Sequence, residues 1–281
     1  MTGQEQWGAD EITVRFGGQT ALDQVSVGAE AGQVTVVVGG DGAGKSTLLR
    51  CVAGALAPAV GTIRRPDAER IGYLPSAGGV YDDLSVQENL QFRSAVYKTP
   101  ATQARRQAGE YLEQTGLAVA RDRLAGQLSG GMRRKLGVIA ALLPGPDLLV
   151  LDEATTGVDP VSRADLWWLV TRAAAGGAAV LMSTTYFDEA ARASRVLVLD
   201  AGRALAAGTP AEITAAVPGT IVAVQERPAD SDERRRAWRR AGAWRIWQPD
   251  GASARPDGEL VPPDLQDAVC VAELRRELAD A

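Results

Sequence analysis

Residues 34–46 read VTVVVGGDGAGKS, and this stretch decides the fold. The β-branched run at 34–38 predicts a buried strand. The residues from Gly39 to Ser46 match the pattern G-x-x-x-x-G-K-[ST] in full. Residues 46–54, STLLRCVAG, predict a helix that a glycine ends. Strand, glycine-rich loop and helix in this order are typical of a phosphate-binding loop, whereas a chance glycine-rich turn would lack the flanking elements.

This phosphate loop supplies most of the residues that we expect to hold a nucleotide. Lys45 would reach the β- and γ-phosphates, and the hydroxyl of Ser46 would bind Mg²⁺. Backbone N–H groups and the positive end of the following helix would favour the phosphate charge. The predicted nucleotide-binding residues of the loop are Gly39, Gly40, Asp41, Gly42, Ala43, Gly44, Lys45, Ser46 and Thr47.

Two acidic residues follow the apolar run at 148–151, which predicts a second buried strand. We expect Asp152 to bind Mg²⁺ through its coordination shell. Glu153 would then orient or deprotonate an attacking water. An acidic helix cap is the alternative for this pair.

Further segments indicate an α/β fold. The runs at 179–183 and 196–200 are apolar up to their last residue, which is typical of a parallel sheet with helices on both faces. Residues 11–27 alternate and predict antiparallel strands. Between 85 and 143 the apolar spacing is helical, with predicted helices at 87–97 and 102–116. The sequence therefore predicts a mainly parallel sheet, antiparallel N-terminal strands and a helical subdomain at about 76–143.

The character of the chain changes after about residue 218, and residues 219–281 are predicted to form a small α+β appendix. The expected elements are strands at 220–225 and 244–247, a basic helix at 230–240, a loop at 251–263 and a helix at 264–281. The arginine run at 234–240 is interpreted as a solvated helix face, with anionic lipid or nucleic acid as the alternative contact.

Composition excludes several classes of function. The chain has 281 residues, a formal net charge of −5, two distant cysteines and no histidine. A zinc site and a disulfide framework are therefore not expected. The acidic balance argues against a nucleic-acid partner. No apolar run approaches the roughly 20 residues of a membrane helix, so we expect a soluble protein whose membrane partner would be another chain.

Residues 128–132, LSGGM, indicate which kind of nucleotide-binding protein this is. Together with the phosphate loop, the acidic strand end and GVDP at 157–160, this signature segment makes residues 9–218 resemble the ATP-binding subunit of an ABC transporter. The resemblance implies a P-loop NTPase fold of the RecA-like type. It also implies that two such subunits, identical or different, close face to face on ATP.

The family resemblance assigns further residues to the ATP site. Ser129, Gly130 and Gly131 would contact the γ-phosphate held by the other subunit, and Asp159 would communicate across the dimer. Phe16 lies where the family places an aromatic ring that stacks on adenine. The alternative for Phe16 is a core strand residue.

A closer resemblance is to exporter subunits that pair with ABC-2 permeases, especially multidrug-efflux ATPases. It rests on IGYLP at 71–75, the segment 79–90, GVDPVSR at 157–163 and PPDLQDA at 262–268. The segment 79–90 is similar to the part of these subunits that faces the permease. The resemblance implies an ATPase that drives export and is cytoplasmic, peripheral on the inner face of the cell membrane.

Two positions depart from the family pattern. Ser76 stands where the family usually has a glutamine that senses Mg²⁺, and Thr185 stands where it usually has a histidine that contacts the γ-phosphate. We expect ATP binding to survive and hydrolysis at this site, which would involve Glu153, Ser76 and Thr185, to be slow. Two alternatives stay open: a soluble ABC ATPase without a permease, and an ATP-binding regulatory partner with little hydrolysis.

Overall fold

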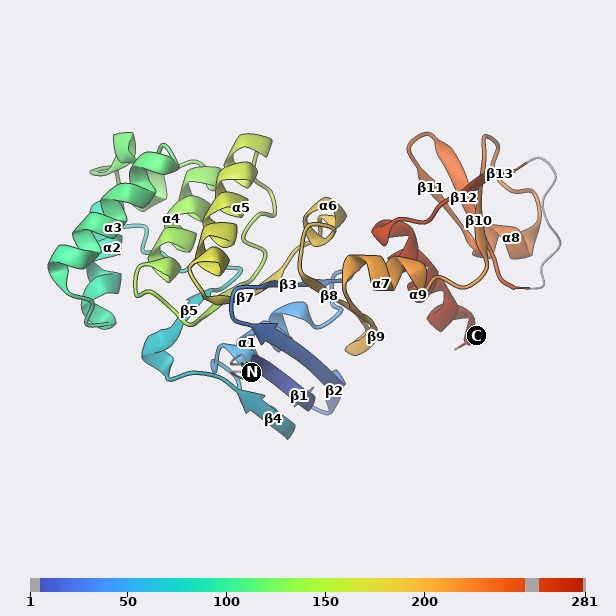
Figure 1. Ribbon diagram of the computed structural model, residues 1–281, viewed down its shortest axis with the longest axis horizontal. Helices are drawn as coiled ribbons and strands as arrows, with labels where there is room; N and C mark the ends of the chain where they lie inside the picture. Colours follow the sequence, from blue (N-terminus) through green and yellow to red (C-terminus); the bar gives the residue numbers. More distant parts are fainter. Residues whose placement is uncertain (1–5, 251–257, 280–281) are drawn as a thin grey trace.

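The computed structural model describes residues 6–250 and 258–279 (Figure 1). Its centre is a six-stranded sheet with the strand order β5-β6-β7-β3-β8-β9. The first five strands are parallel, and β9 is antiparallel to β8. This confirms the predicted parallel sheet; β5 and β9 were not predicted. The strands are β3 (Val34–Val38), β5 (Ile71–Leu74), β6 (Leu148–Leu151), β7 (Ala179–Ser183), β8 (Arg195–Asp200) and β9 (Arg203–Gly208).

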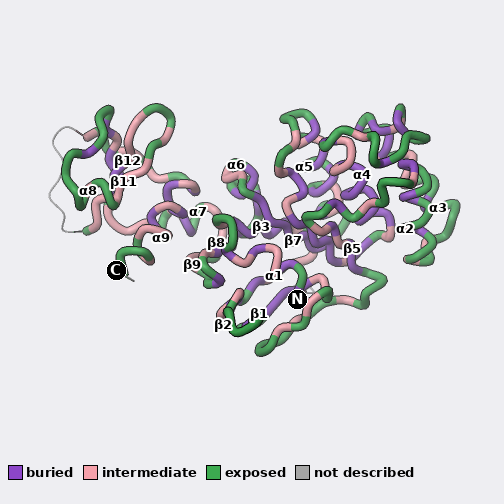
Figure 2. The backbone as a smooth tube through the Cα atoms, turned by 180° about the vertical axis from the view of Figure 1, so that it is seen from behind, coloured by how far each residue is buried: buried purple, intermediate pink, exposed green. Residues whose placement is uncertain are grey.

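Each face of this sheet has its own apolar core, because successive residues of a strand point to opposite faces. Val37 and Leu181 pack with α1 (Lys45–Val52) and the N-terminal strands. Val36 and Met182 belong to the core on the other face, which includes residues of the helices described below. Figure 2 shows the central strands as a buried band between these layers. Burial on both faces explains why the central strands are mostly apolar.

A three-stranded antiparallel sheet packs on one face, with the strand order β2-β1-β4. Its strands are β1 (Gln6–Phe16), β2 (Gln19–Glu30) and β4 (Val60–Arg64). The antiparallel pair predicted within 11–27 is confirmed, and both strands extend beyond it. A two-glycine turn with positive φ joins β1 to β2. This hairpin brings the end of β1 beside the phosphate loop, as described below.

A group of helices forms the end of the molecule opposite the C-terminus (Figure 1). It contains α2 (Val86–Val96), α3 (Ala101–Gln114) and α4 (Gly130–Leu142), with short 3₁₀ turns at Ala118–Ala120 and Ala125–Gln127. The helices predicted at 87–97 and 102–116 are confirmed within two residues. Ser85 caps α2 by accepting a hydrogen bond from the N–H of Glu88, whose carboxylate accepts one from the N–H of Ser85.

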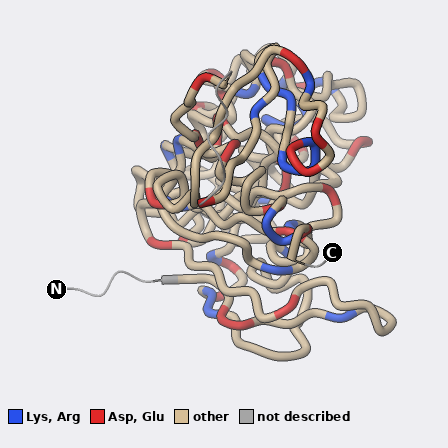
Figure 3. Tube along the Cα trace, turned by 90° about the vertical axis from the view of Figure 1, so that its right-hand side faces the viewer, with Lys and Arg blue, Asp and Glu red and all other residues tan. Residues whose placement is uncertain are grey.

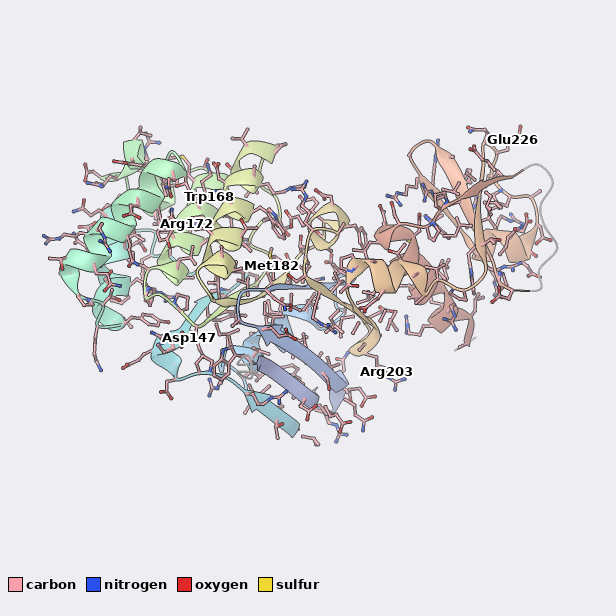
Figure 4. All side chains as sticks on the ribbon, viewed as in Figure 1. Asp147, Trp168, Arg172, Met182, Arg203 and Glu226 are labelled. Carbon is pink, nitrogen blue, oxygen red and sulfur yellow. The ribbon has the colours of Figure 1, made fainter. Side chains whose placement is uncertain are left out.

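Three further helices contribute residues to the same apolar core as α4: α5 (Pro160–Ala175), α6 (Phe187–Ala190) and α7 (Pro210–Ala215). A 3₁₀ turn at Ala68–Arg70 precedes β5. On α5, Trp167 packs against the core. The ring centroid of Trp168 lies 5.2 Å from the guanidinium carbon of Arg172, one helical turn away (Figure 4). Both tryptophans therefore have packing partners within the chain.

The C-terminal residues form a second, smaller sheet with the order β11-β12-β10-β13 (Figure 1). Its elements are β10 (Thr220–Val224), α8 (Ser231–Arg235), β11 (Ala237–Arg240), β12 (Ala243–Gln248), β13 (Glu259–Val261) and α9 (Leu265–Ala279). The strands predicted at 220–225 and 244–247 and the last helix are confirmed, although residues 280–281 lie outside the described residues. The predicted division of the chain at 218/219 stays a prediction.

Two predictions about this region are wrong. The basic helix expected at 230–240 ends at Arg235, and Ala237–Arg240 is a strand. The reason is a tight hairpin: Ala241 and Gly242 adopt positive φ, and Arg240 pairs with Ala243 across the turn. The loop expected at 251–263 contains β13, and its residues 251–257 lie outside the described part of the chain.

Ion pairs connect the C-terminal helix to both sheets. The buried carboxylate of Asp267 pairs with Arg240 and Arg245 of the small sheet. Arg276 Nε lies 2.6 Å from Asp200 Oδ2 at the end of β8. Figure 3 views this end of the molecule and shows basic and acidic residues interspersed. Across the described residues, none of the helices combines the length and apolar character that spanning a membrane requires.

Candidate nucleotide-binding site

The phosphate loop connects β3 to α1, and two of its glycines are required by close contacts. A Cβ atom on Gly39 would lie 1.9 Å from the carbonyl oxygen of Leu199. A Cβ atom on Gly44 would lie 2.7 Å from Leu22 Cδ2, and the φ angle of Gly44 is 103°. Both positions therefore admit only glycine without displacement of the surrounding strands.

Lys45 begins α1 and is 5% exposed. Its Nζ donates hydrogen bonds to the carbonyl oxygens of Gly39, at 2.8 Å, and Gly40, at 2.9 Å. The ammonium group is thus held inside the loop by neutral acceptors. A phosphate entering the loop would replace these neutral acceptors with anionic ones, so that both donor and acceptor would be ionised.

A cavity of about 200 Å³ lies over the loop. The cavity is lined by the phosphate loop, by Glu153 and by Ala21 of β2. It therefore brings Glu153 together with seven of the loop residues that were predicted to bind the nucleotide. The lining residues are Ala21, Asp41, Gly42, Ala43, Gly44, Lys45, Ser46, Thr47 and Glu153.

Asp152 and Glu153 follow β6 directly. Asp152 is 1% exposed, and its Oδ1 accepts a hydrogen bond from Ser183 Oγ at 2.7 Å. Among residues 6–250 and 258–279, no Lys or Arg nitrogen forms a salt bridge with this carboxylate. The helix-cap alternative is wrong, because the next helix after β6 begins only at Pro160.

The oxygen donors near this cavity fit Mg²⁺. The hydroxyl of Ser46 and the carboxylate of Asp152 are hard ligands of the kind that Mg²⁺ prefers. A buried carboxylate without a basic partner is costly unless a cation accompanies it. The donor set and the missing counter-charge therefore both fit a metal at this place.

The end of β7 carries polar residues that the sequence patterns did not single out. Ser183 Oγ accepts a hydrogen bond from the N–H of Glu153 at 2.9 Å. The carboxylate of Glu189 is buried, which raises its pKa, and it accepts hydrogen bonds from the hydroxyls of Thr155 and Thr184. A signal existed: Ser183 and Thr184 end an apolar strand that is parallel to the strand preceding Asp152.

Ser76 and Thr185, which replace the family's glutamine and histidine, are both exposed and do not line the cavity. The carbonyl oxygen of Ser76 accepts a hydrogen bond from Arg134 Nη1 at 2.9 Å. Thr185 follows buried Thr184. Their assignment to hydrolysis stays a prediction.

The signature segment lies at the start of α4, beside the start of α5. Ser129 is the N-cap of α4, and its Oγ accepts a hydrogen bond from the N–H of Met132 at 3.3 Å. A Cβ atom on Gly131 would lie 2.7 Å from Ser162 Oγ and 3.1 Å from Asp159 Oδ2. Gly130 has open space at the corresponding position. Gly131 and Asp159 are thus neighbours. None of Ser129, Gly130, Gly131 and Asp159 lines the phosphate-loop cavity.

Asp159 is the N-cap of α5. Its Oδ1 accepts hydrogen bonds from the N–H groups of Ser162, at 3.0 Å, and Val161, at 3.1 Å. Hydrogen bonding with Ser162 is the main cause that lowers the pKa of Asp159, so this carboxylate stays ionised. A fixed negative charge therefore marks the start of α5.

Phe16 ends β1 and is 47% exposed, so the core alternative for this residue is wrong. It pairs with Gln19 across the hairpin, two residues before the cavity-lining Ala21. This position is compatible with the predicted adenine stacking, which stays a prediction.

Known proteins are similar to this chain in sequence and in fold. The family described as "ABC transporter" matches residues 22–156. The probable multidrug ABC transporter ATP-binding protein YbhF of Escherichia coli is 39% identical over 199 residues, which make up 67% of this chain and 34% of the relative. The chain thus spans about a third of that relative's length. The daunorubicin/doxorubicin resistance ATP-binding protein DrrA of Streptomyces peucetius is 36% identical over 77% of this chain and 69% of the relative.

Solved structures agree. An ATP-binding subunit of an ABC transporter superposes with a TM-score of 0.70 and 25% identity, covering 75% of this chain and 92% of that chain. The dimeric ATP-binding cassette MJ0796 bound to ADP and Pi gives a TM-score of 0.66 over 73% and 98% of the two chains, at 20% identity, and supports the fold alone. The sequence relationship and the shared fold agree, and the chain belongs to the family of ABC transporter ATP-binding proteins.

Proposed function

We propose that this chain binds and hydrolyses ATP and powers export through a separate membrane permease. The observation that carries the proposal is the separation of two half-sites within the chain. Lys45 and Glu153 line one cavity. The carboxylate of the preceding residue, Asp152, is buried and forms no salt bridge within the described residues. The signature segment lies at a different place, beside Asp159. A second subunit is therefore needed to bring a signature segment to the bound ATP.

The proposed mechanism uses residues already in place. The loop N–H groups and the ammonium of Lys45 bind the β- and γ-phosphates. Ser46 and Asp152 would hold Mg²⁺, which neutralises charge on the phosphates. The carboxylate of Glu153 would orient a water for attack on the γ-phosphorus and accept its proton. Phe16 would stack on the adenine.

The second subunit would contribute Ser129, Gly130 and Gly131 to the γ-phosphate. The N-terminus of the 13-residue helix α4 starts there, so its N–H groups favour an anion. Asp159 would connect the two sites across the interface.

The permease is proposed to be of the ABC-2 type and to dock near residues 76–90. Within this segment, Asp82 forms an ion pair with Arg133 of α4. The segment is therefore fastened to the helix that starts at the signature. The names of the relatives, which concern multidrug and daunorubicin resistance, support a small-molecule cargo. The proposed position on the inner face of the cell membrane follows from the proposed permease partner.

A regulatory partner with little hydrolysis is the second candidate function. Neither Ser76 nor Thr185 lines the cavity, so the site has fewer side chains facing the γ-phosphate than the family usually provides. ATP binding would then act mainly through dimer closure.

The test is ATP binding by calorimetry with Lys45→Ala beside Lys98→Ala. Lys98 is an exposed lysine whose Nζ pairs with Glu69, so it serves as the matched control. We expect the wild type and Lys98→Ala to bind Mg·ATP and Lys45→Ala to lose most of this affinity. Equal affinity for Mg·ATP in all three proteins would contradict the proposed nucleotide-binding site. Steady-state hydrolysis by the wild type, with permease, separates the two candidate functions.

A further inference from the structure

The side chain of Ser183 connects the two acidic residues of the site. Its Oγ donates to Asp152 Oδ1 at 2.7 Å and accepts from the backbone N–H of Glu153 at 2.9 Å. Ser183 is 0% exposed, so solvent water does not reach this place. One hydroxyl thus uses its single hydrogen and one lone pair on neighbouring residues that the proposed mechanism needs.

The backbone of Glu153 requires such support. Its φ angle is 51°, in the left-handed region that costs free energy for residues other than glycine. The hydrogen bond to Ser183 Oγ occupies the peptide N–H in this conformation. It therefore stabilises the backbone orientation from which the Glu153 carboxylate extends into the cavity.

The orientation of the Asp152 carboxylate also depends on Ser183. The hydroxyl of Ser183 fixes one of its oxygens, and an ionised acceptor makes this hydrogen bond a strong one. With no Lys or Arg paired to it in the described parts of the chain, Asp152 relies on this bond for its orientation. Mg²⁺ requires near-octahedral coordination, so a carboxylate that binds it must be held in a fixed orientation.

The position of Ser183 is itself secured by the adjacent residues. Thr184 Oγ1 donates to Glu189 Oε2 at 2.6 Å, and Thr155 Oγ1 donates to the same oxygen at 2.8 Å. These bonds join the end of β7 to the segment after Glu153. Arg163 of α5 lies 3.3 Å from the other oxygen of Glu189. These contacts therefore fix the backbone next to Ser183 and, with it, the position of its hydroxyl.

We propose that Ser183 is a positioning residue that holds Asp152 and Glu153 in the arrangement needed for metal binding and hydrolysis. The inference rests on the proposed function, because it assigns a role to Ser183 only if Asp152 holds Mg²⁺ and Glu153 acts on water. Ser183 acts through these two residues and does not itself contact the nucleotide.

The experiment compares Ser183→Ala with Ser94→Ala. Ser94 is also buried, and its hydroxyl donates to the carbonyl oxygen of Leu90 in α2, so its variant removes a buried serine hydroxyl away from the site. For each protein we measure ATP affinity in EDTA, ATP affinity against Mg²⁺ concentration, kcat and the melting temperature. The first two are binding measurements and do not depend on turnover.

For Ser183→Ala we expect the half-saturating Mg²⁺ concentration to rise and kcat to fall, each by about 10-fold or more, as for other residues that orient metal ligands. ATP affinity in EDTA should stay unchanged, and Ser94→Ala should match the wild type in all binding and rate measurements. Ser183→Cys supplies a weaker donor and should give intermediate values; it also serves as the test if Ser183→Ala does not fold.

A lower melting temperature in Ser183→Ala or Ser183→Cys with wild-type Mg²⁺ dependence and kcat would overturn the inference, since Ser183 would then be structural only. A wild type that does not bind Mg·ATP would instead overturn the proposed function.

Discussion

Two buried aspartates show how differently the two ends of this molecule use charge. Asp152, after β6, is 1% exposed and has a neutral hydroxyl from Ser183 as its side-chain partner. Asp267, in α9, is 0% exposed and pairs with the guanidinium groups of Arg240 and Arg245. It also accepts a hydrogen bond from the N–H of Asp264 at 3.1 Å.

The difference separates a binding site from a structural contact. A buried charge must be compensated, or it destabilises the fold. The charge of Asp267 is compensated inside the chain, so it fastens α9 to β11 and β12. The charge of Asp152 has no such compensation in the described residues, so a ligand from outside is expected to supply it. Burial alone therefore does not identify a site; the missing partner does.

The largest effect is expected at the site, from Glu153→Gln. Removing the carboxylate should slow hydrolysis by about 10²–10⁴-fold, the usual contribution of a general base. ATP binding should persist, so the closed dimer should accumulate and be visible by light scattering. The melting temperature without nucleotide should change little.

Lys45→Ala combined with Glu153→Gln is the control, because it should remove ATP binding and leave a monomer. A Glu153→Gln protein that stays monomeric with ATP, with its permease and any second ATPase subunit present, would contradict the two-subunit site.

The two aspartates themselves provide the second prediction. Asp267→Asn leaves the partly buried Arg245 without the counter-charge that it has in the described residues, and Arg240 with Asp264 alone. It should therefore lower the free energy of unfolding by about 3 kcal/mol. Asp152→Asn removes a charge that has no basic partner in the described part of the chain, and should keep or raise the stability of the nucleotide-free protein. Chemical denaturation measures both.

The binding assay should give the opposite order. Asp152→Asn should lose the Mg²⁺ dependence of ATP affinity, whereas folded Asp267→Asn should keep it. Equal destabilisation by the two variants would contradict the distinction between Asp152 as a binding-site residue and Asp267 as a structural residue.

The third prediction concerns the departures from the family at Ser76 and Thr185. Supplying the usual side chains through Ser76→Gln with Thr185→His should raise kcat about tenfold, since each donor to developing charge contributes up to about 10²–10³ in rate. ATP affinity should stay the same. No change, or a fall, would show that the site is already complete by other means.

The sequence revealed the core of the molecule because its signals there are local. The strands at 34–38, 148–151 and 179–183 follow from continuous apolar runs, and the phosphate loop follows from its glycine spacing. Ser183 was not found, because its role depends on β7 lying next to β6 in the sheet. The sequence of neither strand shows that the two strands are adjacent.

The C-terminal region was harder for the same reason. Arginines favour helices in isolation, so residues 230–240 gave a helical pattern. In the structure Arg240 belongs to a strand and pairs with Asp264 and Asp267, which lie more than 20 positions further along the chain. A long-range ion pair thus prevails over local propensity. Within the described residues, the short strand β13 pairs with β10 alone, another partner distant in sequence.

The smallest effect is expected where the two regions meet, at Arg276 and Asp200. Arg276 Nε lies 2.6 Å from Asp200 Oδ2, and both side chains retain some exposure. Arg276→Ala should therefore cost at most about 1 kcal/mol. For a chain of this size that corresponds to roughly 2–4 °C in melting temperature.

This contact also lies close to the phosphate loop. Asp200 precedes the β8–β9 turn, in which the N–H of Gly202 donates to the carbonyl oxygen of Ala43 at 3.0 Å. Arg203→Ala is the matched control, because Arg203 follows the same turn, pairs with Asp23 of β2 and is more exposed than Arg276 (Figure 4). If the C-terminal region only docks on the ATPase core, both variants should keep wild-type ATP affinity. A loss of affinity in Arg276→Ala alone would mean that α9 supports the loop through this turn, and the two regions would then be coupled instead of merely attached.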